Sequence, residues 1–181
     1  MYDKYLTERL ALRILSQSDA RVVADFYARN FDDFKLYEPL PNDNITRISS
    51  QRQLLEFERE QLTQGNRVRF FVFEKDRPMK VVGTVSFRDI RYAYSNSAVL
   101  GYKIDQEYRN LGYATEAIDA GLRIVKKELE VRRVEATVLP DNEASIRVLE
   151  KLDFQREGLL REKIWIEGEW RDHYLYARIM P

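Results

Sequence analysis

The sequence predicts a mixed α/β fold of the α+β kind, in which helices flank a mostly antiparallel sheet. Two strand-like runs, VRFFVFEK and MKVVGTVSFRDI, are joined by the short turn DRP, which is typical of an antiparallel hairpin. A third strand-like run, AVLGYKID, leads through a glycine turn into a helical run, so the chain must cross over the sheet there. Because the 181 residues are 44% hydrophobic, they can form one large core, and we expect a single domain spanning residues 1–181.

The N-terminal part of the chain predicts one strand and two helices. In RLALRIL, leucine and isoleucine alternate with arginine and alanine, as in a half-buried strand. After Ser16 or Ser18, either of which can cap a helix, apolar residues recur at helical spacing until Asn30. The proline-bearing run YEPLPNDN indicates a loop. The following run, rich in Gln, Glu, Arg and Leu, indicates a second helix that ends before Gly65.

The C-terminal part predicts two more helices and three strands. The helix after Gly112 has a continuous apolar stripe, which is typical of a helix that packs on a sheet. RRVEATVLP then alternates as a strand does, and DNEASIRVLEKL predicts a short helix that Asp141 or Asn142 could cap. The last run, GLLREKIWIEGEWRDHYLYARI, predicts a hairpin of aromatic-rich strands that turns at Glu167 and Gly168.

The composition limits the classes of function. Thirty basic and thirty acidic side chains cancel, so the net charge favours neither a nucleic acid nor a membrane surface as partner. The chain has no cysteine, and His173 is its only histidine, so thiolate and multi-histidine metal sites are excluded and we expect no metal. No apolar run approaches the roughly 20 residues of a membrane span, and MYDKYLTERL lacks a signal core. We therefore expect a cytoplasmic protein.

One short motif indicates chemistry. In YRNLGYATEA, at residues 108–117, Gly112 has no Cβ and Ala114 is small, so an anion could approach the backbone where a helix begins. Arg109 is then a candidate charge partner. The spacing fits neither a dinucleotide fingerprint nor a P-loop, and a plain strand-to-helix turn would explain the motif equally well.

Further residues give this motif a context. RNLGYATEA follows a strand ending in GYKID and is itself followed by a helix, a strand and NEASIRVLEKLDF. This arrangement resembles the GNAT superfamily of acetyl-coenzyme A-dependent N-acetyltransferases. TERLALR near the start makes it most similar to the RimJ/RimL type, which acetylates the N-terminal amines of ribosomal proteins. The resemblance covers about Thr7 to Ile179, and its specific part runs from Leu100 to Gly158.

The resemblance implies a GNAT fold, with a parallel pair of splayed strands, and a site for acetyl-coenzyme A (acetyl-CoA). The anion would be the pyrophosphate of coenzyme A (CoA), and the strands LGYKI and VEATV would separate after Ile104 to admit the pantetheine arm. The implied backbone contacts to the pyrophosphate are Asn110, Leu111, Gly112, Tyr113, Ala114 and Thr115, beside Arg109. The implied contacts to the pantetheine arm are Tyr102, Lys103 and Ile104, with Asn142 on the other side.

Two catalytic candidates follow from the same resemblance. Ser145 matches a serine near the thioester sulfur and would stabilise or protonate the departing thiolate, although a serine in a first helical turn can equally support the cap. Asp172 matches an aspartate of the final hairpin and is a weaker candidate for the acceptor site. Two positions that would carry chemistry depart from the pattern: Leu149 replaces a common tyrosine acid, and Val99 replaces a common glutamate base. In a turn, Asp153 replaces the glycine of the usual LGF ending, and because aspartate tolerates a left-handed conformation we expect the turn to survive.

The expected reaction is transfer of an acetyl group to a primary amine. With no base assigned, the site favours an α-amine, whose pKa is about 7.7 to 8.0, over a lysine near roughly 10.4. A protein N-terminus is therefore the favoured acceptor. The alternatives are a small-molecule amine, such as an aminoglycoside, polyamine or amino-acid derivative, and a non-catalytic CoA-binding protein. The aromatic hairpin is also compatible with a homodimer.

Overall fold

The computed structural model describes residues 1–39 and 43–180. Within them, eight strands form one sheet in the order β1-β2-β3-β4-β5-β6-β8-β7. The pairs are antiparallel except for β5 and β6, which are parallel. The strands are β1 (Lys4–Leu6), β2 (Leu10–Arg13), β3 (Val68–Glu74), β4 (Arg77–Arg91), β5 (Ser97–Ile104), β6 (Arg133–Val138), β7 (Gln155–Ile166) and β8 (Glu169–Ile179).

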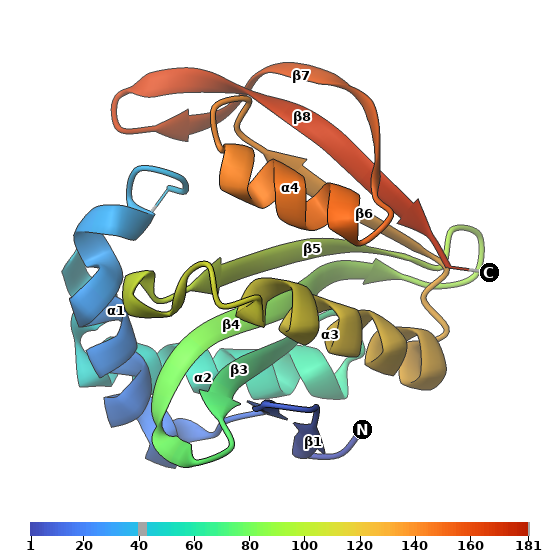
Figure 1. Ribbon diagram of the computed structural model, residues 1–181. Coiled ribbons are helices and arrows are strands. Elements are labelled where there is room, and N and C mark those ends of the chain that lie inside the picture. The colour runs from blue at the N-terminus through green and yellow to red at the C-terminus, as the bar shows by residue number, and fades with distance from the viewer. Residues whose placement is uncertain (40–42, 181) are drawn as a thin grey trace.

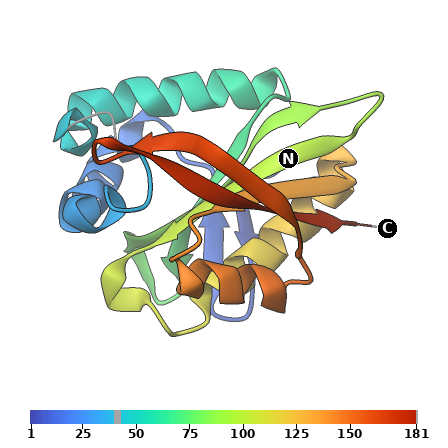
Figure 2. The ribbon, with the colours of Figure 1, turned by 90° about the horizontal axis from the view of Figure 1, so that it is seen from above.

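Four α-helices of the described residues cover this sheet. They are α1 (Ala20–Phe34), α2 (Ile48–Thr63), α3 (Tyr113–Leu129) and α4 (Glu143–Lys151). Helices α1 and α2 lie on one face of the sheet, and α3 and α4 lie on the other (Figures 1 and 2). The mixed α/β architecture expected from the sequence is confirmed. No helix of residues 1–39 and 43–180 combines the length and the apolar character that crossing a membrane requires.

The alternating strand pattern divides the core between the two faces. In β2, Leu10 and Leu12 join the cluster beneath α3 and α4, whereas Ala11 joins the cluster beneath α1 and α2. In β3, Phe70 likewise joins the cluster beneath α3 and α4, and Phe71 joins the cluster beneath α1 and α2. Because side chains alternate along a strand, a central sheet buried on both faces needs apolar residues at successive positions. The run VRFFVFEK meets this requirement.

The ends of the elements differ from the sequence-based expectation in three places. The short strand β1 precedes the first predicted strand and pairs with β2, with Tyr5 opposite Leu12. Helix α1 continues to Phe34 instead of ending at Asn30, because Phe34 packs into the core beside Phe26. Part of the predicted loop YEPLPNDN lies outside the described residues, and its last two residues belong to a 3₁₀ helix at Asp43–Thr46.

Local signals account for the ends that were predicted well. Asn142, rather than Asp141, caps α4: its side chain accepts a hydrogen bond from the Ser145 backbone N–H. The final hairpin turns at Glu167 and Gly168, both with positive φ, as in the turns that connect twisted strands. In Figures 1 and 2 the tip of this hairpin reaches toward the C-terminal end of α1.

Candidate active site

Strands β5 and β6 lie side by side over three residue pairs and then diverge (Figure 1). The last pair joins Val99 to Glu135. Beyond it β5 stays with β4 as far as Ile104, and β6 stays with β8 as far as Val138, so the sheet twist carries the two strands apart. The expectation of a parallel splayed pair is confirmed, but separation after Ile104 is wrong. Within the described part of the chain, the β5 edge from Leu100 onward has no β6 partner and could bind an extended ligand as an added strand.

The glycine turn presents the N-terminal end of α3. Gly112 is the N-cap, with a φ of +80°, and Asn110 has a φ of +61°, so both lie in the left-handed region. No side chain caps this end in the described residues, so the first N–H groups of the helix remain available to an anion. The turn and the first helical residues are the predicted pyrophosphate contacts Asn110, Leu111, Gly112, Tyr113, Ala114 and Thr115.

Two arginines lie beside this turn, and their positions differ from the expectation. The predicted charge partner, Arg109, instead pairs with Asp33 of α1, with Nη1 2.9 Å from Oδ1. Arg9 takes the place at the turn: its Nη1 donates to the Leu111 carbonyl oxygen at 2.8 Å, and its Nε pairs with Glu116 at 2.7 Å. Sequence reasoning missed Arg9 because 107 positions separate it from Glu116, and strand alternation marked it only as a polar-face residue.

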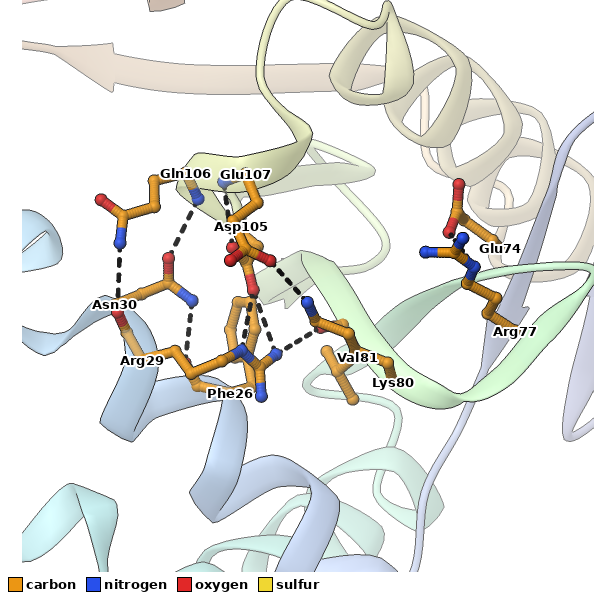
Figure 3. Close-up of polar contacts among 10 residues, drawn as sticks. All are labelled: Phe26, Arg29, Asn30, Glu74, Arg77, Lys80, Val81, Asp105, Gln106 and Glu107. Carbon is orange, nitrogen blue, oxygen red and sulfur yellow. Dashed lines mark hydrogen bonds and ion pairs between the residues drawn. The ribbon is translucent and has the colours of Figure 1, made fainter.

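A buried carboxylate fixes the connection between β5 and the glycine turn (Figure 3). Asp105 is 1% exposed and accepts hydrogen bonds from Nη2 of Arg29 at 3.0 Å and from the Glu107 backbone N–H at 3.1 Å. Next to it, the Gln106 backbone N–H donates to Oδ1 of Asn30 at 3.0 Å. Helix α1 therefore holds the segment that leads to the turn. The sequence signal that could have found Asp105 is an aspartate at a strand end, which caps the following 3₁₀ helix.

A second polar group crosses from β5 to α4. Oδ1 of Asn142 accepts a hydrogen bond from the Ser145 backbone N–H at 3.1 Å, which leaves the serine hydroxyl free for another partner. That partner is the hydroxyl of Tyr102, 2.6 Å from Oγ of Ser145. Burial raises the pKa of Tyr102 to about 12, so this phenol stays protonated at neutral pH. The sequence assigned Tyr102 a backbone role only, and its side-chain contact was not foreseen.

Three consecutive residues of β5 point to alternate faces. Tyr102 and Ile104 face α3 and α4 and pack with that core cluster. Lys103 faces α1 and the segment after it: its Nζ lies 5.1 Å from the ring centre of Tyr27 on α1 and 2.5 Å from Oε1 of Glu38. The backbone of the three predicted pantetheine contacts therefore lies along one strand edge, whereas their side chains pack on opposite faces of the sheet.

The candidate in the final hairpin has a structural partner of its own. Oδ1 of Asp172 accepts a hydrogen bond from the Glu162 backbone N–H at 2.8 Å, where β7 and β8 shift register and Glu162 has a φ of +47°. Asp172 also lines an open hollow of about 360 Å³ together with Pro140, Asp141, Glu169, Trp170 and Arg171. The neighbouring His173 is buried, and its Nδ1 lies 3.1 Å from the Arg171 carbonyl oxygen. Burial lowers the pKa of His173.

The two departures from the family pattern that bear on chemistry, at Val99 and Leu149, have clear places in the fold. Val99 is half-buried at the last β5–β6 pair, and Leu149 is fully buried in the core beneath α4. On the other face of the sheet, the buried carboxylate of Glu58 lies 3.1 Å from Nη2 of Arg69. Burial raises the pKa of Glu58, although Arg69 acts in the opposite direction. The general base stays unassigned. No group of three or more histidine, cysteine or acidic residues suited to a metal ion occurs in the described ranges.

Comparison with known proteins places this geometry in a family. Residues 9–155 match the acetyltransferase (GNAT) domain. The chain is 30% identical to the [ribosomal protein uS5]-alanine N-acetyltransferase of Escherichia coli (strain K12) over 175 residues, which cover 97% of this chain and 90% of the relative.

Solved structures agree with this assignment. The ribosomal-protein-S5-alanine acetyltransferase of Vibrio fischeri superposes with a TM-score of 0.92 at 28% identity, covering 97% of this chain and 96% of that one. Mycobacterium smegmatis RimJ, solved in complex with CoA-disulfide, superposes with a TM-score of 0.88 at 26% identity, covering 94% and 81%. The expected RimJ/RimL resemblance, the enzyme class and acetyl-CoA as the co-substrate of the family are confirmed. The chain belongs to the GNAT family of acetyltransferases, and its relatives include ribosomal-protein N-acetyltransferases of the RimJ/RimL type.

Proposed function

We propose that the chain, as a single domain, transfers the acetyl group of acetyl-CoA directly to the N-terminal α-amine of a protein. The observation that carries this proposal is the divergence of β5 and β6 after Val99, between the Gly112 turn on one side and Ser145 on the other. A helix N-terminus suits a pyrophosphate, a free strand edge suits an extended amide-containing arm, and a hydroxyl suits a departing thiolate.

The glycine turn fits the pyrophosphate. Backbone N–H groups from Asn110 to Thr115 would donate to it, and the left-handed conformation of Gly112 leaves the approach free of a Cβ. The positive charge for this anion would come from Arg9, which already lies beside the turn, and from Arg109 once it leaves Asp33.

The pantetheine arm would follow the edge of β5. The backbone of Tyr102, Lys103 and Ile104 would pair with its amide groups as a neighbouring strand does. Asn142 uses its Oδ1 for the helix cap, so its Nδ2 remains to donate to a carbonyl oxygen of the arm. Because the oxygen and the nitrogen of the side-chain amide have separate partners, Asn142 can both cap α4 and bind the pantetheine arm.

This chain's own residues would act on the reaction as hydrogen-bond donors. Acetyl-CoA, when bound, supplies an acetyl group already activated as a thioester. A backbone N–H of β5 near Leu100 would donate to the oxygen that becomes negative during attack, and Ser145 Oγ would donate to the sulfur as the C–S bond breaks. The attacking nitrogen loses one proton and the sulfur gains one, so no external acid or base is consumed.

An α-amine fits a site in which no strong base is assigned. With a pKa of about 7.7 to 8.0, an α-amine is uncharged in roughly a tenth or more of molecules at pH 7. The name of the Escherichia coli relative, a ribosomal-protein alanine N-acetyltransferase, supports an acceptor of this kind. Asp172 stays our weaker candidate for the acceptor site. It lines the hollow beside Pro140, where β6 leads into α4.

The test is acceptor-dependent release of CoA thiol from acetyl-CoA. The panel should hold peptides with free N-termini, the same peptides with blocked N-termini, polyamines and aminoglycosides. We expect thiol release only with free peptide N-termini. Thiol release with polyamines or aminoglycosides alone would mean that the acceptor is a small-molecule amine and not a protein N-terminus. Tight CoA binding without thiol release with any amine would overturn the proposal that the protein is an enzyme.

Two further features belong to this proposal. A cytoplasmic location is supported by relatives named for their action on ribosomal proteins. A homodimer is supported by Trp165 and Trp170, which are 50% and 59% exposed at the hairpin tip with ring centres 5.5 Å apart. The homodimer is tested by measuring the mass of the protein in solution and comparing it with that of a Trp165→Ser and Trp170→Ser double variant.

A further inference from the structure

The hydroxyl of Tyr102 connects β5 to the first turn of α4, where those elements diverge. It lies 2.6 Å from Oγ and 3.2 Å from the backbone carbonyl oxygen of Ser145. The tyrosine side chain itself packs on the core cluster beneath α3 and α4, so the phenol is held from behind by apolar neighbours. One rigid side chain therefore defines where the Ser145 hydroxyl lies relative to β5.

The rest of Ser145 is already fixed by hydrogen bonds. Its backbone N–H donates to Oδ1 of Asn142 at 3.1 Å. Its carbonyl oxygen lies in the first turn of α4, next to the Tyr102 hydroxyl. What remains variable is the direction of the serine O–H bond. Among the described residues, the hydroxyl oxygen of Tyr102 is the only hydrogen-bond partner of Oγ.

The chemistry of the two hydroxyls sets the direction of the bond between them. A phenol, with an ordinary pKa of about 10, is a far stronger hydrogen-bond donor than an aliphatic alcohol. A buried phenol needs a partner for its proton, and the contact to Oγ is shorter than the contact to the carbonyl oxygen. The phenol has one proton and two acceptors within reach, the Ser145 carbonyl oxygen at 3.2 Å and Oγ at 2.6 Å. Donation along the shorter contact makes Oγ the acceptor and leaves the serine O–H to point elsewhere.

We propose that Tyr102 is a positioning residue for acetyl transfer, because its donation to Ser145 Oγ turns the serine O–H toward the departing sulfur. The inference rests on the proposed role of Ser145 and deepens it. Tyr102 keeps its own proton throughout and changes only the direction in which Ser145 donates. In this chain, where Leu149 lacks a hydroxyl, the Tyr102–Ser145 pair supplies the hydrogen-bond donor near the thiolate.

The test is a double-mutant cycle of Tyr102→Phe and Ser145→Ala, measured as kcat, KM for acetyl-CoA and dissociation constant for CoA. We expect Tyr102→Phe to lower kcat by about tenfold and to change KM and CoA binding by less than about twofold. In the Ser145→Ala background the same change should have no further effect, because the group it orients is absent.

Tyr176→Phe is the matched control. Its hydroxyl donates to Glu150 on α4 at 3.2 Å, so the variant also loses a phenol contact to this helix but none to Ser145. We expect its kcat to equal that of the unmodified protein. An equal loss in Tyr176→Phe would identify a general effect of loosening α4 and would overturn the positioning role.

A second measurement uses a pH profile and does not depend on the folding of Tyr102→Phe. Site-specific 3,5-difluorotyrosine at position 102 preserves the shape but has a lower phenol pKa, and an ionised phenolate cannot donate. We expect kcat to fall at an alkaline pH where the unmodified enzyme stays active, and an unchanged profile would overturn the proposal.

The outcomes separate this inference from the proposed function. Thiol release that is normal in both Tyr102→Phe and Ser145→Ala would remove the pair from the mechanism while acetyl transfer stands. The positioning role would likewise be overturned if Tyr102→Phe lowered kcat equally with and without Ser145→Ala. The same holds if Tyr102→Phe changed KM alone. Failure of the unmodified protein to release thiol with any amine would instead overturn the proposed function.

Discussion

Arg9 donates through Nη1 to the backbone carbonyl oxygen of Leu111 at 2.8 Å and thereby joins the start of β2 to the glycine turn. The same guanidinium pairs through Nε with Glu116 in the first turn of α3 and lies over the ring of Tyr113. A cation is thus held beside Gly112 by contacts made before any ligand arrives. This preorganisation is what an anion site at a helix N-terminus requires.

Replacing Arg9 should weaken CoA binding. In Arg9→Ala the turn loses its adjacent cation, and the carboxylate of Glu116 stays near the phosphate without its ion-pair partner, held only by the Thr7 hydroxyl and a backbone N–H. We expect the dissociation constant for CoA to rise about tenfold or more by isothermal titration calorimetry. The matched control is Arg13→Ala at the other end of β2, whose guanidinium contacts Pro78 and Phe73 instead. Equal CoA affinity in the two variants would contradict a phosphate role for Arg9.

Replacing Gly112 should separate backbone strain from ligand binding. Gly112→Ala places a Cβ at a φ of +80°, and Gly168→Ala does the same at +87° in the exposed hairpin turn. Each should lower the free energy of unfolding by about 1 kcal/mol, because L-residues disfavour the left-handed region. Only Gly112→Ala should also weaken CoA binding, by about tenfold or more. A similar CoA affinity in both variants would remove the glycine turn from the cofactor site.

Most of the fold follows from short-range signals in the sequence. Alternation in RLALRIL and RRVEATVLP, the strand-like runs around the DRP turn, and the glycine and asparagine signals at helix ends predict the order of the main elements. Strand β1 was missed because three residues of KYL give too little alternation to register. The end of α1 was missed because packing of Phe34 against Phe26, and not a local signal, extends the helix.

The site was less predictable than the fold, for a physical reason. The motif around Gly112 is local, so its left-handed turn could be anticipated from residue type alone. Arg9 and Tyr102 act through side chains that meet partners far along the chain, and nothing in the spacing announces such contacts. Arg109 illustrates the converse: its place next to the motif suggested a ligand contact, whereas its guanidinium pairs with Asp33 of α1.

Removing the buried carboxylate of Asp105 should destabilise the fold and the turn together. Asp105→Ala leaves Nε of Arg29 and the Glu107 backbone N–H without their acceptor, and Nη2 of Arg29 keeps only the Val81 carbonyl oxygen. We expect the free energy of unfolding in urea to fall by about 3 kcal/mol, and CoA binding to weaken because the segment before the turn loses its attachment to α1. The control Asp32→Ala removes an ion pair whose carboxylate is 89% exposed, and should cost less than about 1 kcal/mol. Equal costs would show that the Asp105 network is not a stabilising one.

His173 should make the protein less stable in mildly acidic solution. Burial lowers the pKa of His173 below its ordinary value of 6.5, so the unfolded chain binds a proton more readily than the folded protein does. Stability is therefore full above pH 6.5 and is lost as the pH falls through the folded-state pKa.

The measurement for His173 is the difference in free energy of unfolding between the unmodified protein and His173→Gln, from urea titrations between pH 5 and pH 8. Carboxylates shared by both proteins cancel in this difference, so its slope reports His173 alone. We expect the unmodified protein to lose stability relative to His173→Gln below about pH 6.5, and a constant offset above it. A difference independent of pH over the whole range would mean that the imidazole has the same pKa in the folded and unfolded states. The buried environment next to Asp172 would then not act on its protonation.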